Sequence, residues 1–169
     1  TYGGSCASAM VAATVGNNTV TFNALGEGVY SDCTVMVTDS VGNVSSALAV
    51  NTFTIDATPP LLAEVVAVVA LDNDATPRYT FSSNEIGVIA YGGSCAATDF
   101  SAVVGNNVID FTALSDGTYT DCTVTVTDRA GNPSLPLDVS DFTVDTTLPV
   151  VTEVTAVTPN LTGDNTPDY

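Results

Sequence analysis

The chain carries the stretch YTDCTVTVT at residues 119–127, and this stretch decides the fold class. Cys122, Val124 and Val126 alternate with polar residues, which is the period-two pattern of a strand with one buried face. A nearly identical stretch, YSDCTVMVT, occurs 89 positions earlier at residues 30–38 (119 minus 30). The fold is therefore expected to consist of strands and to occur more than once.

The same offset of 89 relates other parts of the chain. It carries YGGSC from residues 2–6 to 91–95, GNN from 16–18 to 105–107, and the FTID stretch of 53–56 onto FTVD at 142–145. A fixed period of this size over the whole chain indicates a tandem array of similar modules. Such arrays act through length and spacing more than through a single reactive pocket.

Proline-rich stretches after each copy mark the module boundaries: DATPP at 56–60 and DTTLP at 145–149. Proline restrains itself and the preceding residue, so these stretches predict short, stiff linkers. Residues 1–56 are then the C-terminal part of a first module, 57–145 a complete module, and 146–169 the opening of a following one. Either the chain is a segment of a longer one, or neighbouring chains complete each other's modules. Positions matching 80–89 have no counterpart in the partial modules, which favours the longer chain.

Composition excludes several classes of function. The chain has 19 acidic residues against two arginines and no lysine or histidine, a net charge of −17. Nucleic-acid binding needs a basic surface, so no nucleic-acid partner is expected. Without histidine, Ser-His-Asp and Cys-His catalysis are impossible, and we expect no enzyme. No apolar run is long enough to span a bilayer, so no membrane insertion is expected in this segment. The acidity serves either solubility or divalent-cation binding.

The four cysteines form two equivalent sets. Cys6 and Cys33 are 27 positions apart, and so are Cys95 and Cys122. Four cysteines allow three connectivities, of which only Cys6–Cys33 with Cys95–Cys122 treats both copies alike. Free buried thiols are the alternative. Paired disulfides predict an oxidising, extracellular location.

The complete module predicts seven short strands, at residues 62–69, 78–82, 87–91, 100–104, 108–111, 119–127 and 137–144. GNN at 105–107 is typical of a tight hairpin turn. Seven strands in about 90 residues predict an all-β chain of tandem immunoglobulin-like β-sandwich modules. The LSDGTY stretch before the sixth strand resembles the tyrosine corner of such folds. One intramodule disulfide per module should tie the loop after the third strand to the sixth strand within one sheet.

The stretches TVTDRAGN at 125–132 and FTVDTTLP at 142–149 resemble the bacterial Ig-like repeats of large surface proteins, adhesins and extracellular fibre proteins. The resemblance implies a structural repeat segment of a secreted or cell-surface protein, forming a stalk or extracellular filament. Its partners would be neighbouring modules, joined head to tail or laterally. The alternative is an adhesin module that binds glycan or protein. The copies differ little in loop length, which favours the structural role.

Acidic and amide side chains should gather where two modules meet. In an Ig-like module the relevant loops place Asn84, Glu85, Asp128 and Asn132 beside the linker residue Asp56, with Glu27 of the preceding copy facing them. Hard oxygen ligands of this kind suit Ca²⁺, and the family resemblance also implies calcium between modules. Ordinary turn chemistry of Asp and Asn is the alternative.

Three asparagines lie in the glycosylation sequon: Asn17, Asn43 and Asn160. The equivalent positions of the complete module lack it, and chance occurrence is the alternative in a chain this rich in Thr and Asn.

Overall fold

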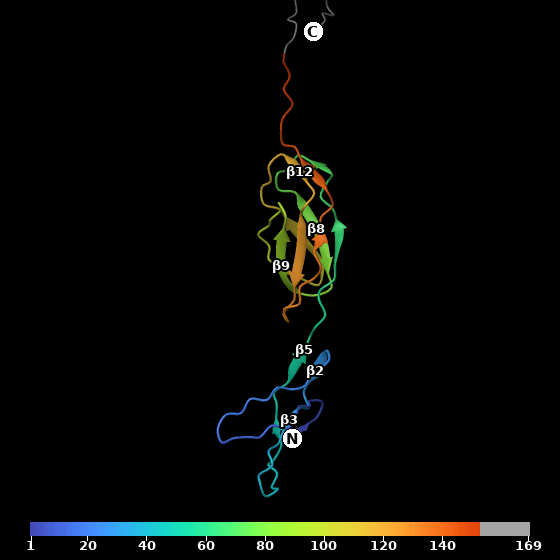
Figure 1. Ribbon diagram of the computed structural model, residues 1–169. Coiled ribbons are helices and arrows are strands. Elements are labelled where there is room, and N and C mark those ends of the chain that lie inside the picture. Colours follow the sequence, from blue (N-terminus) through green and yellow to red (C-terminus); the bar gives the residue numbers. More distant parts are fainter. Residues whose placement is uncertain (153–169) are drawn as a thin grey trace, which may run out of the picture.

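Every regular element in residues 1–152, the part of the chain that the computed structural model describes, is a β-strand. The all-β prediction is therefore confirmed for this range. Figure 1 shows two bodies along the chain, with strands β1 to β5 in one and β6 to β15 in the other. We call residues 57–145 the closed unit and residues 1–56 the open unit.

Three sheets make up the closed unit. The first has the order β10-β9-β13-β14, with β9 (Gly87–Gly92), β10 (Ser101–Ala102), β13 (Thr123–Thr127) and β14 (Leu137–Asp138). The second has the order β11-β8-β6, with β6 (Leu62–Val66), β8 (Arg78–Ser83) and β11 (Gly105–Asp110). The third has the order β12-β15-β7, with β7 (Leu71–Asp72), β12 (Gly117–Tyr119) and β15 (Phe142–Val144), and β7 runs parallel to β15.

These sheets enclose one hydrophobic core. Phe81 of β8, Val124 of β13 and Val144 of β15 come from different sheets, and each is at most 1% exposed. A row of stacked rings runs through the core from Tyr79 to Phe111, Phe142 and Tyr119, with centroid separations of 6.0, 6.2 and 5.2 Å. The alternation predicted for 119–127 is also present, because Cys122, Val124 and Val126 are buried while the threonines between them are half-buried.

The predicted strand boundaries were wrong in three places. Residues 119–127 and 137–144 were each predicted as one strand but are each divided between two strands, and the strand predicted at 62–69 ends at residue 66 and is followed by an unpredicted strand at 71–72, so that seven predicted strands become ten. In every case the two strands pair in different sheets; β12 pairs with β15, whereas β13 pairs with β9 and β14. Periodicity reports which face is buried and carries no information about which neighbour a strand has.

The predicted hairpin at 105–107 is also absent. These residues begin β11, which pairs with β8, whereas the preceding strand β10 pairs with β9. The chain therefore crosses from one sheet to another here. The Asn107 side chain holds this corner, accepting from the Val103 amide at 2.8 Å and donating to the carbonyls of Val103 and Gly105, both at 3.0 Å.

The disulfides join Cys6 to Cys33 and Cys95 to Cys122, the pairing that the repeat favours. Cys95 follows β9, and Cys122 immediately precedes β13, whose first residue pairs with Gly92. The bond therefore ties a loop to the adjacent strand of the same sheet, as predicted. All four half-cystines are at most 4% exposed.

The second glycine of each YGGSC stretch is structurally required. Gly93 has a φ of +71°, and a Cβ added there would overlap the backbone carbonyl of Asp121. The next residue, Ser94, donates its hydroxyl to the Asp121 carboxylate at 2.9 Å. In the open unit, Ser5 makes the same contact with Asp32 at 2.9 Å.

Replacing Gly93 by alanine is expected to lower the free energy of unfolding by about 2 to 3 kcal/mol, since left-handed strain and steric overlap add. Gly105→Ala is the matched control: its φ is +95°, but nothing lies within 4 Å of the added Cβ. Only strain remains there, so a loss of about 1 kcal/mol is expected. Urea denaturation measures both variants, and equal losses would show that the Asp121 contact does not matter.

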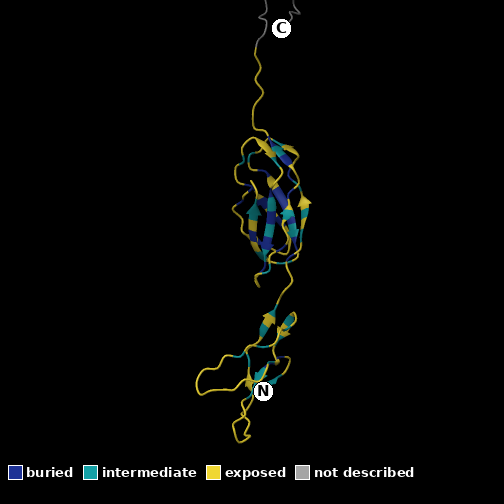
Figure 2. Cartoon of the chain, viewed as in Figure 1, coloured by how far each residue is buried: buried dark blue, intermediate teal, exposed yellow. Residues whose placement is uncertain are grey.

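The open unit repeats part of the closed unit's architecture. Its strands are β1 (Tyr2–Gly3), β2 (Gly28–Tyr30), β3 (Thr34–Val35), β4 (Leu48–Ala49) and β5 (Phe53–Ile55), in the orders β1-β3-β4 and β2-β5. Residues 1–56 include no counterpart of β6 to β8. Val37 is 47% exposed, whereas its counterpart Val126 is 0% exposed. Figure 2 shows the resulting contrast: burial is concentrated in β6 to β15.

Candidate functional site

Three carboxylates meet where the open unit joins the closed unit. Asp56 follows β5, Glu85 lies in the turn between β8 and β9, and Asp128 directly follows β13. One carboxylate oxygen from each lies within 4.8 Å of the others. We call these residues the junction carboxylates. The structure thus brings together three of the six residues that the sequence places at this junction.

The predicted ligand Asn132 lies at the same junction and donates hydrogen bonds to its neighbours. Its side-chain amide nitrogen donates to the Asp128 carboxylate at 2.8 Å and to the backbone carbonyl of Asp56 at 3.1 Å. Its backbone amide also donates to Asp128, at 2.8 Å. Asn132 therefore positions the junction carboxylates by donating hydrogen bonds. Asp39 and Asn43 make the same side-chain contact in the open unit at 2.8 Å, so this part of the site is the turn chemistry of the repeat.

Glu27 lies outside the close group of three but belongs to the same junction. It accepts a hydrogen bond from the Thr58 hydroxyl at 2.6 Å. The equivalent acid of the next copy, Asp116, accepts hydrogen bonds from the hydroxyls of Thr146 and Thr147, both at 2.7 Å. Each linker is thus fastened to the preceding turn by the same kind of bond, which we call the linker latch.

Sequence reasoning missed Thr58. The signal was present, because a threonine stands two positions after the acid that ends each copy, at Thr58 and Thr147. Asn84, which was expected beside the carboxylates, accepts a hydrogen bond from the Leu61 amide at 2.6 Å and so holds the start of β6.

The electrostatics of the junction differ from one carboxylate to the next. Partial burial, and then the charges of Asp56, Asp128 and Glu27, raise the pKa of Glu85. At Asp128 burial also acts to raise the pKa, but hydrogen bonds from Asn132 and the Gly131 amide outweigh it and leave the pKa below its usual value. Repulsion is therefore concentrated on Glu85.

This arrangement can hold a divalent cation. Three carboxylates offer up to six oxygens, and Ca²⁺ takes six to eight oxygen ligands. A bound cation would remove the repulsion that raises the Glu85 pKa. The ion pair found in residues 1–152 is Arg78–Asp110, which belongs to β8 and β11 and not to this junction.

The predicted glycosylation residues are only partly described. Asn17 and Asn43 are exposed, and the Asn43 amide donates to Asp39 at 2.8 Å. Asn160 lies outside the described residues. Glycosylation at all three stays a prediction.

None of the protein-family models, curated proteins or solved structures compared with the chain matches it. Two disulfides indicate a secreted protein that matures outside the reducing cytoplasm. Residues 1–152 contain no helix with the length and hydrophobicity needed to cross a membrane.

Proposed function

We propose that this chain is a structural repeat segment of a secreted or cell-surface bacterial protein, and that its modules form a stalk or extracellular filament. The linker latch is the observation that carries this proposal. The latches Thr58–Glu27 and Thr147–Asp116 lie 89 positions apart (147 minus 58), so both copies direct the outgoing chain in the same way. A repeated exit direction gives an array of constant spacing, which is what a stalk requires.

The fold that supports this role is the immunoglobulin-like β-sandwich. Tyr119 donates its hydroxyl to the Ser115 carbonyl at 2.8 Å, and Tyr30 donates to Gly26 at the same distance. A tyrosine that bonds back to the backbone a few residues upstream is the tyrosine corner of Ig-like folds. The crossing of the chain between sheets at β6–β7 and β10–β11 fits the same architecture.

Calcium at the junction carboxylates would stiffen the array. Asp56 belongs to the linker, whereas Glu85 and Asp128 belong to the closed unit, so one cation would bind both. Glu27 would add charge from the preceding copy. An array with its linkers held in this way resists bending at every module boundary.

Calcium is expected to raise the thermal midpoint of the closed unit by about 5 °C when present at tenfold its dissociation constant. Affinities of extracellular calcium modules predict half-saturation at about 0.1 to 1 mM. Differential scanning calorimetry with calcium and with chelator measures the shift. Glu85→Gln should abolish it, whereas Asp138→Asn, an exposed change on β14, should keep it. An equal response of both variants contradicts binding at this junction.

Glu85 should also make stability depend on pH when divalent cations are absent. Because its pKa is raised in the folded state, its favourable contribution is complete below the ordinary Glu pKa of about 4.3 and is lost as pH rises through the raised value. Glu85→Gln should therefore be more stable than the parent at about pH 7, with the difference shrinking toward about pH 4. Thermal midpoints in chelator test this, and a difference that stays constant with pH would refute it.

Immunoelectron microscopy of the native assembly tests the structural role. Antibody against the closed unit should label filaments or stalks along their length at regular intervals. A glycan array and a binding screen with the same chain test the alternative. Label confined to tips, together with saturable glycan or protein binding, would replace the stalk with an adhesin module.

A further inference from the structure

The closed unit has a groove between β10 and β11. Its volume is about 540 Å³, and its walls come from the segment 98–101, which runs into β10, and the segment 103–108, which runs into β11. Two buried residues that line it, Ile89 and Ile109, form an apolar floor, and each is at most 2% exposed. Walls and floor all belong to one module, so the groove is complete without a neighbouring module.

Both walls of the groove are held by hydrogen bonds. In the first wall the Tyr91 hydroxyl donates to the Asp99 carbonyl, and the Ile89 amide donates to the Phe100 carbonyl at 2.9 Å. In the second wall the buried Asn107 side chain holds the corner of the chain, as described above. The groove is therefore preorganised, which lowers the entropy cost of binding a ligand.

The groove presents an aromatic ring to solvent. Phe100 lines the groove and is nevertheless 58% exposed. The Tyr91 ring packs against it with a centroid separation of 6.2 Å and an interplanar angle of 62°, which fixes its orientation. Two exposed polar residues, Asp99 on the same wall and Asn106 on the opposite wall, flank the ring. The site thus combines an apolar ring face with an accepting carboxylate and a carboxamide that both donates and accepts.

The wall that carries this ring is where the two copies of the repeat diverge. Residues 97–101 (ATDFS) correspond to residues 8–12 (SAMVA), and every position differs, which is the longest unbroken run of differences between the copies. The opposite wall is kept, since Asn18 repeats the hydrogen bonds of Asn107. The ring and the carboxylate are therefore particular to the closed unit and are not required by the repeat itself.

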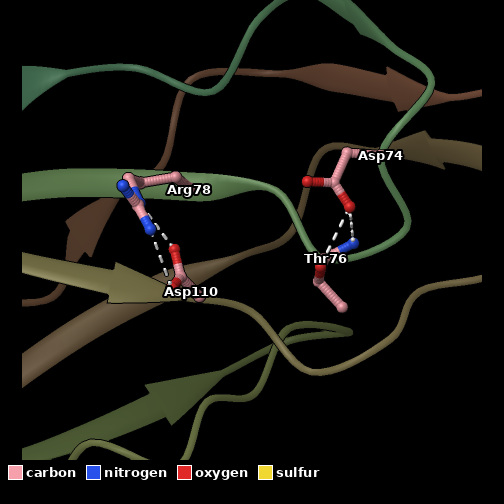
Figure 3. Close-up of polar contacts among 4 residues, drawn as sticks. All are labelled: Asp74, Thr76, Arg78 and Asp110. Carbon is pink, nitrogen blue, oxygen red and sulfur yellow. Dashed lines mark hydrogen bonds and ion pairs between the residues drawn. The ribbon is translucent and has the colours of Figure 1, made fainter.

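Charge restricts the ligands that fit this groove. The residues that line it include one carboxylate, Asp99, and no basic side chain. Arg78 donates to Asp110, the last residue of β11, at 2.7 Å beside the Asp74–Thr76 turn (Figure 3), and Arg129 lies in the turn after β13. In a chain with a net charge of −17, the groove repels anionic ligands. A neutral ligand with hydroxyl groups and an apolar face fits it, and a hexose ring has both.

A peptide strand fits this groove less well. Peptides that dock on a sheet add their backbone to an exposed strand edge. The strand next to the ring, β10, is an edge strand but has only two residues, Ser101–Ala102. It therefore offers too short a ladder for strand addition, whereas the C–H face of a sugar needs only the face of one ring.

We propose that this groove binds a neutral hexose unit of a glycan, with the sugar ring stacked on Phe100 and its hydroxyls bonded to Asp99 and Asn106. The inference goes beyond the structural role and does not depend on it. A single open site of this size gives weak binding, with a dissociation constant of about 0.1 to 1 mM. The open unit, which lacks the ring and the carboxylate, should not bind.

Nuclear magnetic resonance titration of the isotope-labelled 169-residue chain tests the proposal. The probes are cellotetraose, mannotetraose and galactotetraose, with the glucuronate tetramer of the same linkage as the anionic counterpart of cellotetraose. At least one neutral tetramer should shift the amide signals of residues 98–108 saturably, while those of residues 9–19 stay unmoved. The glucuronate tetramer should bind at least about tenfold more weakly than the neutral tetramer, because its carboxylates meet Asp99.

Variants of the wall test the roles of its residues. Phe100→Val introduces the residue that the open unit has at this place, Val11, and should weaken binding about tenfold because the stacking face is lost. Asp99→Asn should weaken it about fivefold, since a hydrogen bond to a charged acceptor becomes a neutral one. Val66→Ala is the matched control: Val66 is also 58% exposed but lies on β6, away from the groove, and its loss should leave binding unchanged.

The proposal is overturned if no tetramer shifts these amides at about 10 mM, or if Phe100→Val binds as well as Val66→Ala does. A phage-displayed peptide that shifts them when no tetramer does would replace the sugar with a peptide partner. Either failure would leave the stalk intact, because regular antibody labelling along native filaments does not require a ligand. Conversely, sugar binding by a chain that forms no filaments would remove the proposed function and keep the groove as a binding site.

Discussion

Phe81→Ala is expected to lower the free energy of unfolding of the closed unit by about 4 kcal/mol. Phe81 is 0% exposed and stacks near Tyr79 with a centroid separation of 6.3 Å. It lies in β8, the central strand of its sheet, so its removal leaves a cavity that neighbouring strands cannot easily close. The free energy of unfolding of a domain of this size is about 5 to 15 kcal/mol in total. A loss of this magnitude therefore threatens folding itself.

Val108→Ala is the matched control for this prediction. Val108 lies on β11, the neighbouring strand, and is 54% exposed. Its truncation should lower the free energy of unfolding by less than about 1 kcal/mol. Urea denaturation followed by circular dichroism measures both variants. Comparable losses would mean that the core is not closed around β8.

Removing the disulfide of the closed unit, by the double substitution Cys95→Ala and Cys122→Ala, should lower its free energy of unfolding by about 3.5 kcal/mol. The bond closes a loop with a sequence separation of 27, and its release returns that freedom to the unfolded chain. Both half-cystines also belong to the buried core, so the variant loses packing as well.

The repeat supplies an internal control for the disulfide. Cys6→Ala with Cys33→Ala removes the equivalent bond from the open unit, which has no closed core. The main unfolding transition should stay at the parent's midpoint in this variant. Calorimetry of both double variants decides the matter, and a large shift from the Cys6–Cys33 pair would mean that the two units unfold together.

Much of this fold follows from the local pattern of the sequence. Alternation at Cys122, Val124 and Val126 predicted the buried face of β13, and equal cysteine spacing in two copies favoured the observed disulfides. Loop positions also predicted that Asp56, Glu85 and Asp128 would meet. These features depend on the alternation of residues, on the spacing of cysteines and on the repeat, all of which can be read from one sequence.

Other features depend on partners that are distant in the sequence. Val108 and Asn107 look like one arm of a hairpin, yet β11 pairs with β8 because Asn107 turns the chain into a different sheet. Likewise, Tyr119 and Thr123 appear to share a strand but pair with Phe142 and Gly92. The role of Asn132 could not be predicted either, since the choice between its oxygen and nitrogen depends on how the backbone of Asp56 approaches.

The disulfide within one sheet has a mechanical consequence. If the modules form the proposed stalk and are stretched from end to end, the bond between Cys95 and Cys122 excludes the 27-position loop from lengthening. Of an 89-residue repeat, 62 residues (89 minus 27) can then lengthen, giving about 220 Å of slack per rupture instead of about 310 Å at about 3.5 Å per residue. Reduction of this bond would make such a stalk longer and more compliant under load.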